Sequence, residues 1–298
     1  MSAPLPAIGA GAPLRGIAFM VLATAFYAAS DTLAKVMLQD YSVLQVTWAR
    51  YFFALVLVLP AFLRIDPRVA LTSARPVWQA SRSVLMIVAA GIYFVALRTM
   101  PVADVTAIFY VEPLVLTAIA VPLLGERVGL RRWIGVAVGF CGMLLIIRPG
   151  FGATDPVAIL PFLAAFMFAL YQVTTRRMST RDGPFTTYLY LVITGTVLMS
   201  VLAPFDWRAP DLRGWLLFGL QGTLGGFAQL FLIRALSVAP ASAMAPFRYG
   251  QLVFATIGGL LVFGQVPDEW TAAGMLVIAG AGLYVWMRER RALAAAKP

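Results

Sequence analysis

Ten apolar blocks make up most of the chain, and each is long enough to cross the hydrocarbon core of a bilayer as a helix. Backbone groups inside lipid must bond to one another, so only helices or a closed barrel can span it. The blocks lack the two-residue alternation of barrel strands, which leaves helices. Their approximate bounds are 15–37, 43–63, 76–97, 101–124, 130–148, 156–176, 184–204, 213–233, 239–263 and 270–287.

The composition supports an all-α polytopic membrane protein with ten transmembrane helices. Of the 298 residues, 61% are hydrophobic and only 12% are charged. A soluble domain usually carries about 25% charged residues. The polar residues that remain here are too few to cover a water-facing surface.

The basic residues divide unequally between the two sides of the predicted membrane. If the N-terminus is cytoplasmic, fifteen Lys and Arg lie on the inner side, five lie on the outer side, and Arg50, Arg82 and Arg248 fall within blocks. This positive-inside bias places both termini in the cytoplasm. The net charge of +10 therefore reflects topology, and we expect membrane lipids and a small molecule as partners, with no nucleic acid.

The second half of the sequence repeats the first at an offset of 139 residues: Pro101 matches Pro240 and Tyr110 matches Tyr249. Near the starts of the two halves the offset is 141. Five spans is an odd number, so the second copy enters the membrane from the opposite side. Inverted repeats of this kind are a transporter architecture, with the substrate site near the midplane.

These matches predict one membrane domain built from two five-helix repeats. We expect an N-terminal tail at 1–14, a first repeat at 15–148, a second at 153–288 and a C-terminal tail at 289–298.

Two related segments carry a resemblance to a known family. The segment "ALRTMPVADVTAIFYVEPLVLTAIAVPLLGERVGLRRWIGVAVGFCGMLLI" (96–146) has Pro113 in mid-span and a glycine-bearing helix after it. The segment "ALSVAPASAMAPFRYGQLVFATIGGLLVFGQVPDEWTAAGMLVIAGAGL" (235–283) repeats the pattern, with Leu252 at the position that matches Pro113. Together with the five-plus-five organisation, the chain resembles the EamA-type branch of the drug/metabolite transporter superfamily. The resemblance implies a secondary transporter of the bacterial cytoplasmic (inner) membrane, similar to exporters of amino acids, aromatic ones included.

Glu112 and Arg248 are the principal candidate site residues, because each lies near the middle of an otherwise apolar block. A charge at the centre of a membrane helix costs about 2.5–3.5 kcal/mol, so it needs a partner or a wet cavity. An arginine fork matches a carboxylate and an acid can hold an ammonium group, so the two would suit an amino acid. The alternative is a buried structural bridge that never contacts substrate.

Deep tyrosines and amides are further candidates for the substrate site, because a buried polar group needs a partner. The alternative is that they bond neighbouring helices, or that the tyrosines belong to the interfacial aromatic belt. The candidates are Tyr27, Tyr93, Tyr110, Tyr171, Tyr249, Gln229 and Gln251.

Asp31 is, with Glu112, a candidate for proton or ion coupling. Lys35 follows Asp31 by one helical turn, so the sequence favours an in-helix pair near the outer surface. Arg50 and Arg82 are each about two turns from a membrane face, where we expect them to act as interface anchors.

Prolines and glycines within the blocks are candidate hinges for a rocking motion. They are Pro113, Pro246, Gly225 and Gly226.

The residue types argue against an enzyme and against a metal or cofactor site. The chain has no histidine and a single cysteine, Cys141, and its acids are not clustered. Two alternatives to metabolite export stay open, a proton-coupled antiporter of cationic drugs and a flippase of a lipid-linked substrate. A monomer and a homodimer are both compatible with the sequence.

Overall fold

Helices form the whole regular structure of the described chain. The computed structural model describes residues 12–62, 71–124, 129–148, 156–178, 182–238 and 241–295, and these ranges hold no β-strand. The α-helices are α1 (Ala12–Met37), α2 (Val43–Phe62), α4 (Pro76–Thr99), α5 (Val102–Phe109), α6 (Glu112–Leu124), α7 (Leu130–Ile147), α8 (Leu160–Met178), α9 (Pro184–Leu202), α10 (Leu212–Val238), α11 (Ala241–Arg248), α12 (Gly250–Phe263) and α13 (Glu269–Ala295). Two 3₁₀ turns, Pro156–Ile159 and Ala203–Asp206, precede α8 and follow α9.

The polytopic helical prediction is confirmed. Within the described residues, nine spans are long and apolar enough to cross a membrane. The remaining predicted crossing corresponds to α7, whose apolar part, Trp133–Ile147, is shorter. The predicted tail 1–14 lies mostly outside the described residues, and α13 continues to Ala295.

The two halves of the chain form corresponding helices in corresponding places. At the offset of 139 residues, α5 falls on α11, and at the offset of 141 the start of α2 falls on the start of α9. Contacts correspond as well, because α1 packs against α10 while its counterpart α8 packs against α4. An exchange of this kind relates the halves by a pseudo-two-fold axis, as expected for inverted repeats.

The membrane crossings at 101–124 and 239–263, which the sequence predicts as continuous, are each interrupted at the same point of the repeat. The first turns at Tyr110 and Val111 between α5 and α6, and the second turns at Tyr249 between α11 and α12. Pro113 explains the first break, because its nitrogen cannot donate to the carbonyl one turn earlier. The second copy has Leu252 there, so its break has no such local cause. The two tyrosine rings meet, with centroids 5.5 Å apart.

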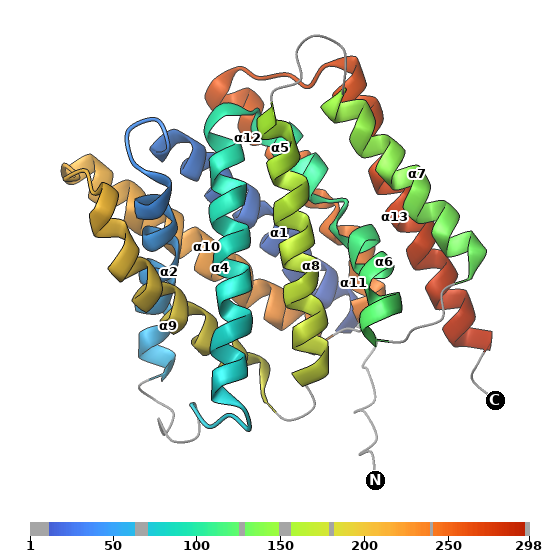
Figure 1. Cartoon of the computed structure of the whole chain (residues 1–298), viewed down its shortest axis with the longest axis horizontal. Coiled ribbons are helices and arrows are strands. Elements are labelled where there is room, and N and C mark those ends of the chain that lie inside the picture. Colours follow the sequence, from blue (N-terminus) through green and yellow to red (C-terminus); the bar gives the residue numbers. More distant parts are fainter. Residues whose placement is uncertain are drawn as a thin grey trace.

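Glycines allow α7 and α13 to lie in direct contact along one side of the bundle, on the right in Figure 1. A Cβ on Gly142 would come within 3.0 Å of the Gly274 carbonyl oxygen, and a Cβ on Gly274 within 2.6 Å of that of Gly142. The two backbones can approach this closely only without side chains. On the opposite side of the bundle, α2 packs beside α9 (Figure 1).

The start of α1 and the end of α13 lie at the same end of the bundle, the lower one in Figure 1. This agrees with an even number of crossings. We call this the terminal end of the bundle. Its assignment to the cytoplasm rests on the distribution of arginines.

Candidate functional site

A central cavity of about 570 Å³ lies between the two repeats. Its size falls within the range of roughly 300–1,000 Å³ that small-molecule sites occupy. All nine predicted substrate-site residues line it, from both repeats, and their role there stays a prediction. They are Tyr27, Tyr93, Tyr110, Glu112, Tyr171, Gln229, Arg248, Tyr249 and Gln251.

The cavity extends from the middle of the bundle toward the terminal end. The residues that α10 contributes are Gln229, Leu232 and Leu236, all near its C-terminal end. Toward the opposite end, α5 packs against α12 and no lining residue of α1 lies beyond Asp31. With the predicted topology, the cavity therefore lies on the cytoplasmic side of the packed region formed by α5 and α12.

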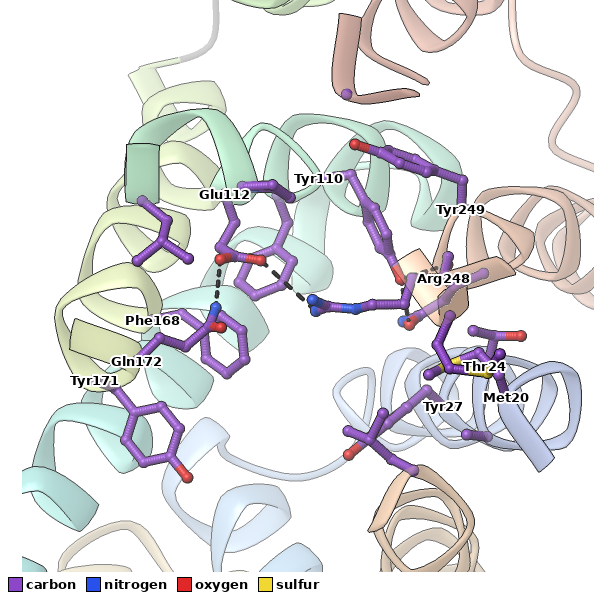
Figure 2. Close-up of a pocket in the computed structure, with 18 of the residues that line it drawn as sticks. Met20, Thr24, Tyr27, Tyr110, Glu112, Phe168, Tyr171, Gln172, Arg248 and Tyr249 are labelled. Atoms are coloured by element: carbon purple, nitrogen blue, oxygen red, sulfur yellow. Dashed lines mark hydrogen bonds and ion pairs between the residues drawn. The ribbon is translucent and has the colours of Figure 1, made fainter. Parts of the chain in front are cut away.

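Glu112 and Arg248 face each other across the cavity (Figure 2). Glu112 begins α6 and Arg248 ends α11, so both side chains come from the interruptions of the broken crossings. Arg248 Nη2 lies 3.6 Å from Glu112 Oε2, and the arginine side chain keeps 35% of its surface exposed against 3% for the glutamate. The pair is therefore a bridge across an accessible space.

Each cavity acid accepts a hydrogen bond from an amide of the other repeat. Gln172 Nε2 on α8 donates to Glu112 Oε1. Gln251 Nε2 on α12 donates to Asp31 Oδ2 on α1 over 3.2 Å. Gln172 is only a weak candidate from the sequence, although it matches Asp31 at the offset of 141, which could have identified it.

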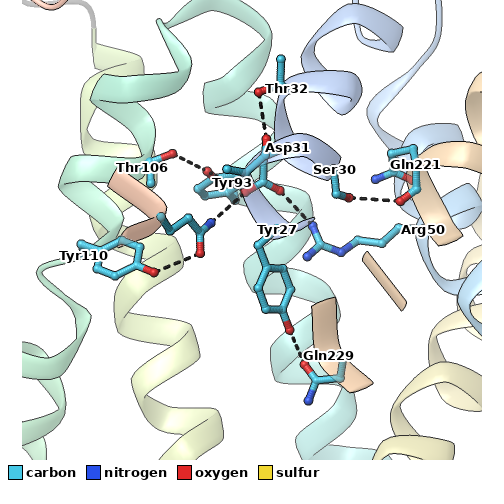
Figure 3. A network of polar contacts seen from close by, with 12 residues as sticks. Tyr27, Ser30, Asp31, Thr32, Arg50, Tyr93, Thr106, Tyr110, Gln221 and Gln229 are labelled. Atoms are coloured by element: carbon cyan, nitrogen blue, oxygen red, sulfur yellow. Dashed lines mark hydrogen bonds and ion pairs between the residues drawn. The ribbon is translucent and has the colours of Figure 1, made fainter. Parts of the chain in front are cut away.

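The expected pairing of Asp31 with Lys35 is wrong. Asp31 pairs with Arg50, with Nη1 and Oδ1 3.4 Å apart (Figure 3). Lys35 Nζ instead donates to the carbonyl oxygens of Leu97 and Met100. The last carbonyls of a helix lack partners within that helix, so the end of α4 attracts a cation.

The expectation that Arg50 and Arg82 anchor the interface is also wrong. Arg50 lines the cavity, and its guanidinium lies 5.4 Å from the ring centroid of Phe94. Arg82 is only 2% exposed and donates to Gln79 and Thr175. Distance from a block edge misled here, because neighbouring helices cover that depth.

Tyrosine hydroxyls connect the cavity wall from helix to helix (Figure 3). The single O–H of Tyr110 is shared between the Arg248 carbonyl oxygen at 2.8 Å and Gln251 Oε1 at 3.0 Å. Tyr27 donates to Gln229 Oε1. Tyr93 donates to Asp31 Oδ2 at 3.3 Å. The helix-bonding alternative therefore holds for these groups, which also face the cavity.

The predicted hinge residues occupy two different environments. Pro113 and Pro246 line the cavity beside the interrupted crossings. Gly225 and Gly226 lie within the continuous helix α10, where a Cβ on Gly226 would come within 2.7 Å of Leu57. Their hinge role stays a prediction, and the glycines have a packing role in this state.

The EamA-like transporter family model matches residues 14–148 and 156–287, one copy in each half of the chain. The chain belongs to this family. The match covers nearly all of the sequence and agrees with the repeat found from the residues. The protein is therefore a multi-pass, small-molecule transporter of the EamA type.

Curated relatives within the family carry different substrates. The chain is 26% identical over 280 residues to the S-adenosylmethionine uptake transporter of Rickettsia prowazekii, covering 94% of this chain and 95% of that one. It is 29% identical over 280 residues to the riboflavin transporter of Vibrio cholerae, covering 92% and 94%. It is also 29% identical over 188 residues to the pseudopaline exporter CntI of Pseudomonas aeruginosa, covering 62% and 66%.

Proposed function

We propose that this EamA-type transporter exports small amphipathic metabolites, amino acids including aromatic ones among them, across the bacterial inner membrane by alternating access. The observation that carries the proposal is the Glu112–Arg248 pair, which spans a cavity between two inverted repeats. A charged pair at this depth that keeps accessible surface marks a substrate pathway in membrane proteins.

The cavity wall suits a substrate with one polar head and an aromatic or apolar body. The exposed Arg248 fork would receive a carboxylate bidentately, and Glu112 Oε2, which faces it, would receive an ammonium group. Around them stand the rings of Tyr27, Tyr171 and Phe168 (Figure 2). Flat side chains stack favourably on such rings.

The named substrates of two relatives support an aromatic-bodied substrate. S-adenosylmethionine carries an α-amino-acid group and a purine ring, and riboflavin carries a flat fused ring system. Ring systems of this kind would stack on the aromatic side chains that line the cavity of this chain. The relatives include proteins named for uptake and for export, so we base export on the resemblance to amino-acid exporters.

A proton-coupled antiporter of cationic drugs is the second candidate. Two acids in one cavity, Asp31 and Glu112, favour it. Each acid already lies beside an arginine, which offsets the negative charge that would attract an organic cation. The geometry therefore supports a dipolar substrate better than a cation.

Transport by purified protein in proteoliposomes tests the proposal. Labelled phenylalanine, tryptophan, leucine, S-adenosylmethionine, riboflavin and an organic cation would be loaded inside or outside, with and without a pH gradient. We expect saturable flux of the amino acids, competed by one another. Flux of the organic cation alone would support the antiporter instead, and flux of none of the six would refute both.

A further inference from the structure

Two arginines of the cavity hold hydrogen-bond donors that the described protein leaves unused. Arg248 has a single partner among the described side chains, Glu112 at 3.6 Å. Among the described residues, Arg50 donates a hydrogen bond only from Nη1, to Asp31 Oδ1 at 3.4 Å. An arginine has five N–H donors, and its bonds to carboxylates are usually about 2.7–2.9 Å long. Both guanidiniums can therefore donate hydrogen bonds to a further anionic partner.

The two acids of the cavity, in contrast, already accept hydrogen bonds from the protein. Asp31 accepts hydrogen bonds from Tyr93 and Gln251 in addition to Arg50. Glu112 accepts one from Gln172. Each acid therefore already receives at least one hydrogen bond from the protein, whereas most N–H groups of Arg50 and Arg248 have no acceptor among the described side chains.

Arg50 is held in place on the cavity wall. Its guanidinium lies 5.4 Å from the ring centroid of Phe94, and Asp31 fixes one end of it. Gly225 on α10 lies beside it, and a Cβ there would make an ordinary contact of 3.9 Å with Arg50 Nε. The side chain is 14% exposed, and Arg50 lines the same cavity as Arg248.

We infer that Arg50 forms a second anion-binding subsite, so that the preferred substrates are amino acids whose aromatic or apolar side chain ends in a second carboxylate. Arg248 would hold the α-carboxylate and Arg50 the distal one. This inference rests on the proposed function, because it assigns the second end of the same substrate. The inference goes beyond the proposed function by giving Arg50 a role in substrate specificity.

Asp31 offsets the charge of Arg50, so the distal carboxylate would be held by the remaining guanidinium N–H donors and not by an excess of positive charge. Asp31 contacts the Arg50 guanidinium through Nη1 alone, which leaves Nε and Nη2 as the pair of donors for a bidentate contact. A charge-assisted hydrogen bond contributes more than a neutral one, so a lost distal contact should reduce affinity by about tenfold or more.

Binding to the full-length transporter in lipid nanodiscs tests the inference with three probes that differ only at the para position of one ring. They are L-phenylalanine, L-4-carboxyphenylalanine and L-4-aminophenylalanine, measured by calorimetry. The wild-type protein should bind the carboxy compound at least about tenfold more tightly than either of the others. Equal binding of phenylalanine and its carboxy derivative would overturn the inference while leaving the proposed function intact. Binding of none of the three would overturn both.

Variants locate the preference at Arg50. The double variant D31N/R50Q removes both charges together, so no acid is left unpaired, and it should reduce affinity for the carboxy compound at least about tenfold more than affinity for phenylalanine. R50K keeps the charge without the fork and should reduce the preference partly. R248Q should weaken both compounds. R213Q, on the exposed first turn of α10, is the matched control and should behave like wild type. A preference that survives in both D31N/R50Q and R50K would refute the assignment.

Discussion

Gln251 Nε2 donates to Asp31 Oδ2 over 3.2 Å, and this bond between the repeats has a counterpart in the hydrogen bond from Gln172 to Glu112. Gln251 matches Glu112 at the offset of 139 residues, and Gln172 matches Asp31 at 141. Both bonds therefore join the first helix of one repeat to the broken crossing of the other. The two acids come from the first repeat and the two amides from the second, so the cavity is symmetric in position but not in charge.

This relationship predicts the outcome of a side-chain exchange. E112Q and Q172E should each reduce the transport rate by about tenfold or more, because one removes the charge opposite Arg248 and the other places two acids together. The double variant E112Q/Q172E returns one carboxylate to the pair and should recover part of the rate. Proteoliposome flux at saturating substrate gives the comparison. A double variant no better than the worse single one would show that the helix carrying the acid matters more than its presence.

Arg248 should be sensitive to loss of its fork even when its charge is kept. R248K leaves a cation near Glu112 but removes the planar pair of donors, so we expect the KM for a carboxylate substrate to rise by about tenfold. Initial rates over a range of substrate concentrations measure this effect. R213K serves as the control, and an unchanged KM in R248K would remove Arg248 from the carboxylate contact.

The contact between α7 and α13 should be intolerant of a methyl group at Gly274. The added Cβ would lie 2.6 Å from the Gly142 carbonyl oxygen, so the helices must separate, at a cost of about 1–3 kcal/mol. Thermal unfolding in detergent should show a lower midpoint for G274A. A Cβ added to Gly280 on the same helix would meet no atom within 4 Å, so G280A should have a midpoint at or above that of wild type. Equal midpoints for the two variants would contradict the packing assignment.

A loop aspartate outside the membrane spans should make stability depend on pH. Partial burial alone would raise the pKa of Asp182, but hydrogen bonds from Ser73, Gln79 and the Ala74 N–H hold that pKa below its ordinary value of 3.8. A depressed pKa means that Asp182 stabilises the fold above pH 3.8, and that this contribution is lost as the pH falls through the folded-state value.

D182N should therefore lower the unfolding midpoint of the transporter at neutral pH and flatten its change in the acid range. Unfolding in detergent between about pH 3 and pH 7 measures both effects. Asp206 closes the 3₁₀ turn after α9, at the other end of the bundle, so D206N is the control. A D182N curve parallel to that of wild type would exclude the effect.

The sequence alone determined the class of the protein, since long apolar blocks permit little but membrane helices. The repeat offset and the depth of Glu112 and Arg248 also followed from it, because both depend only on spacing along the chain. Only the tertiary structure decided that Asp31 pairs with Arg50 and that Lys35 binds the end of α4. It also showed that Gln172 reaches Glu112 and that the second crossing breaks at Tyr249 without a proline at the matching position. These contacts join helices far apart in the chain, and spacing within one helix carries no information on which neighbour its side chains will meet.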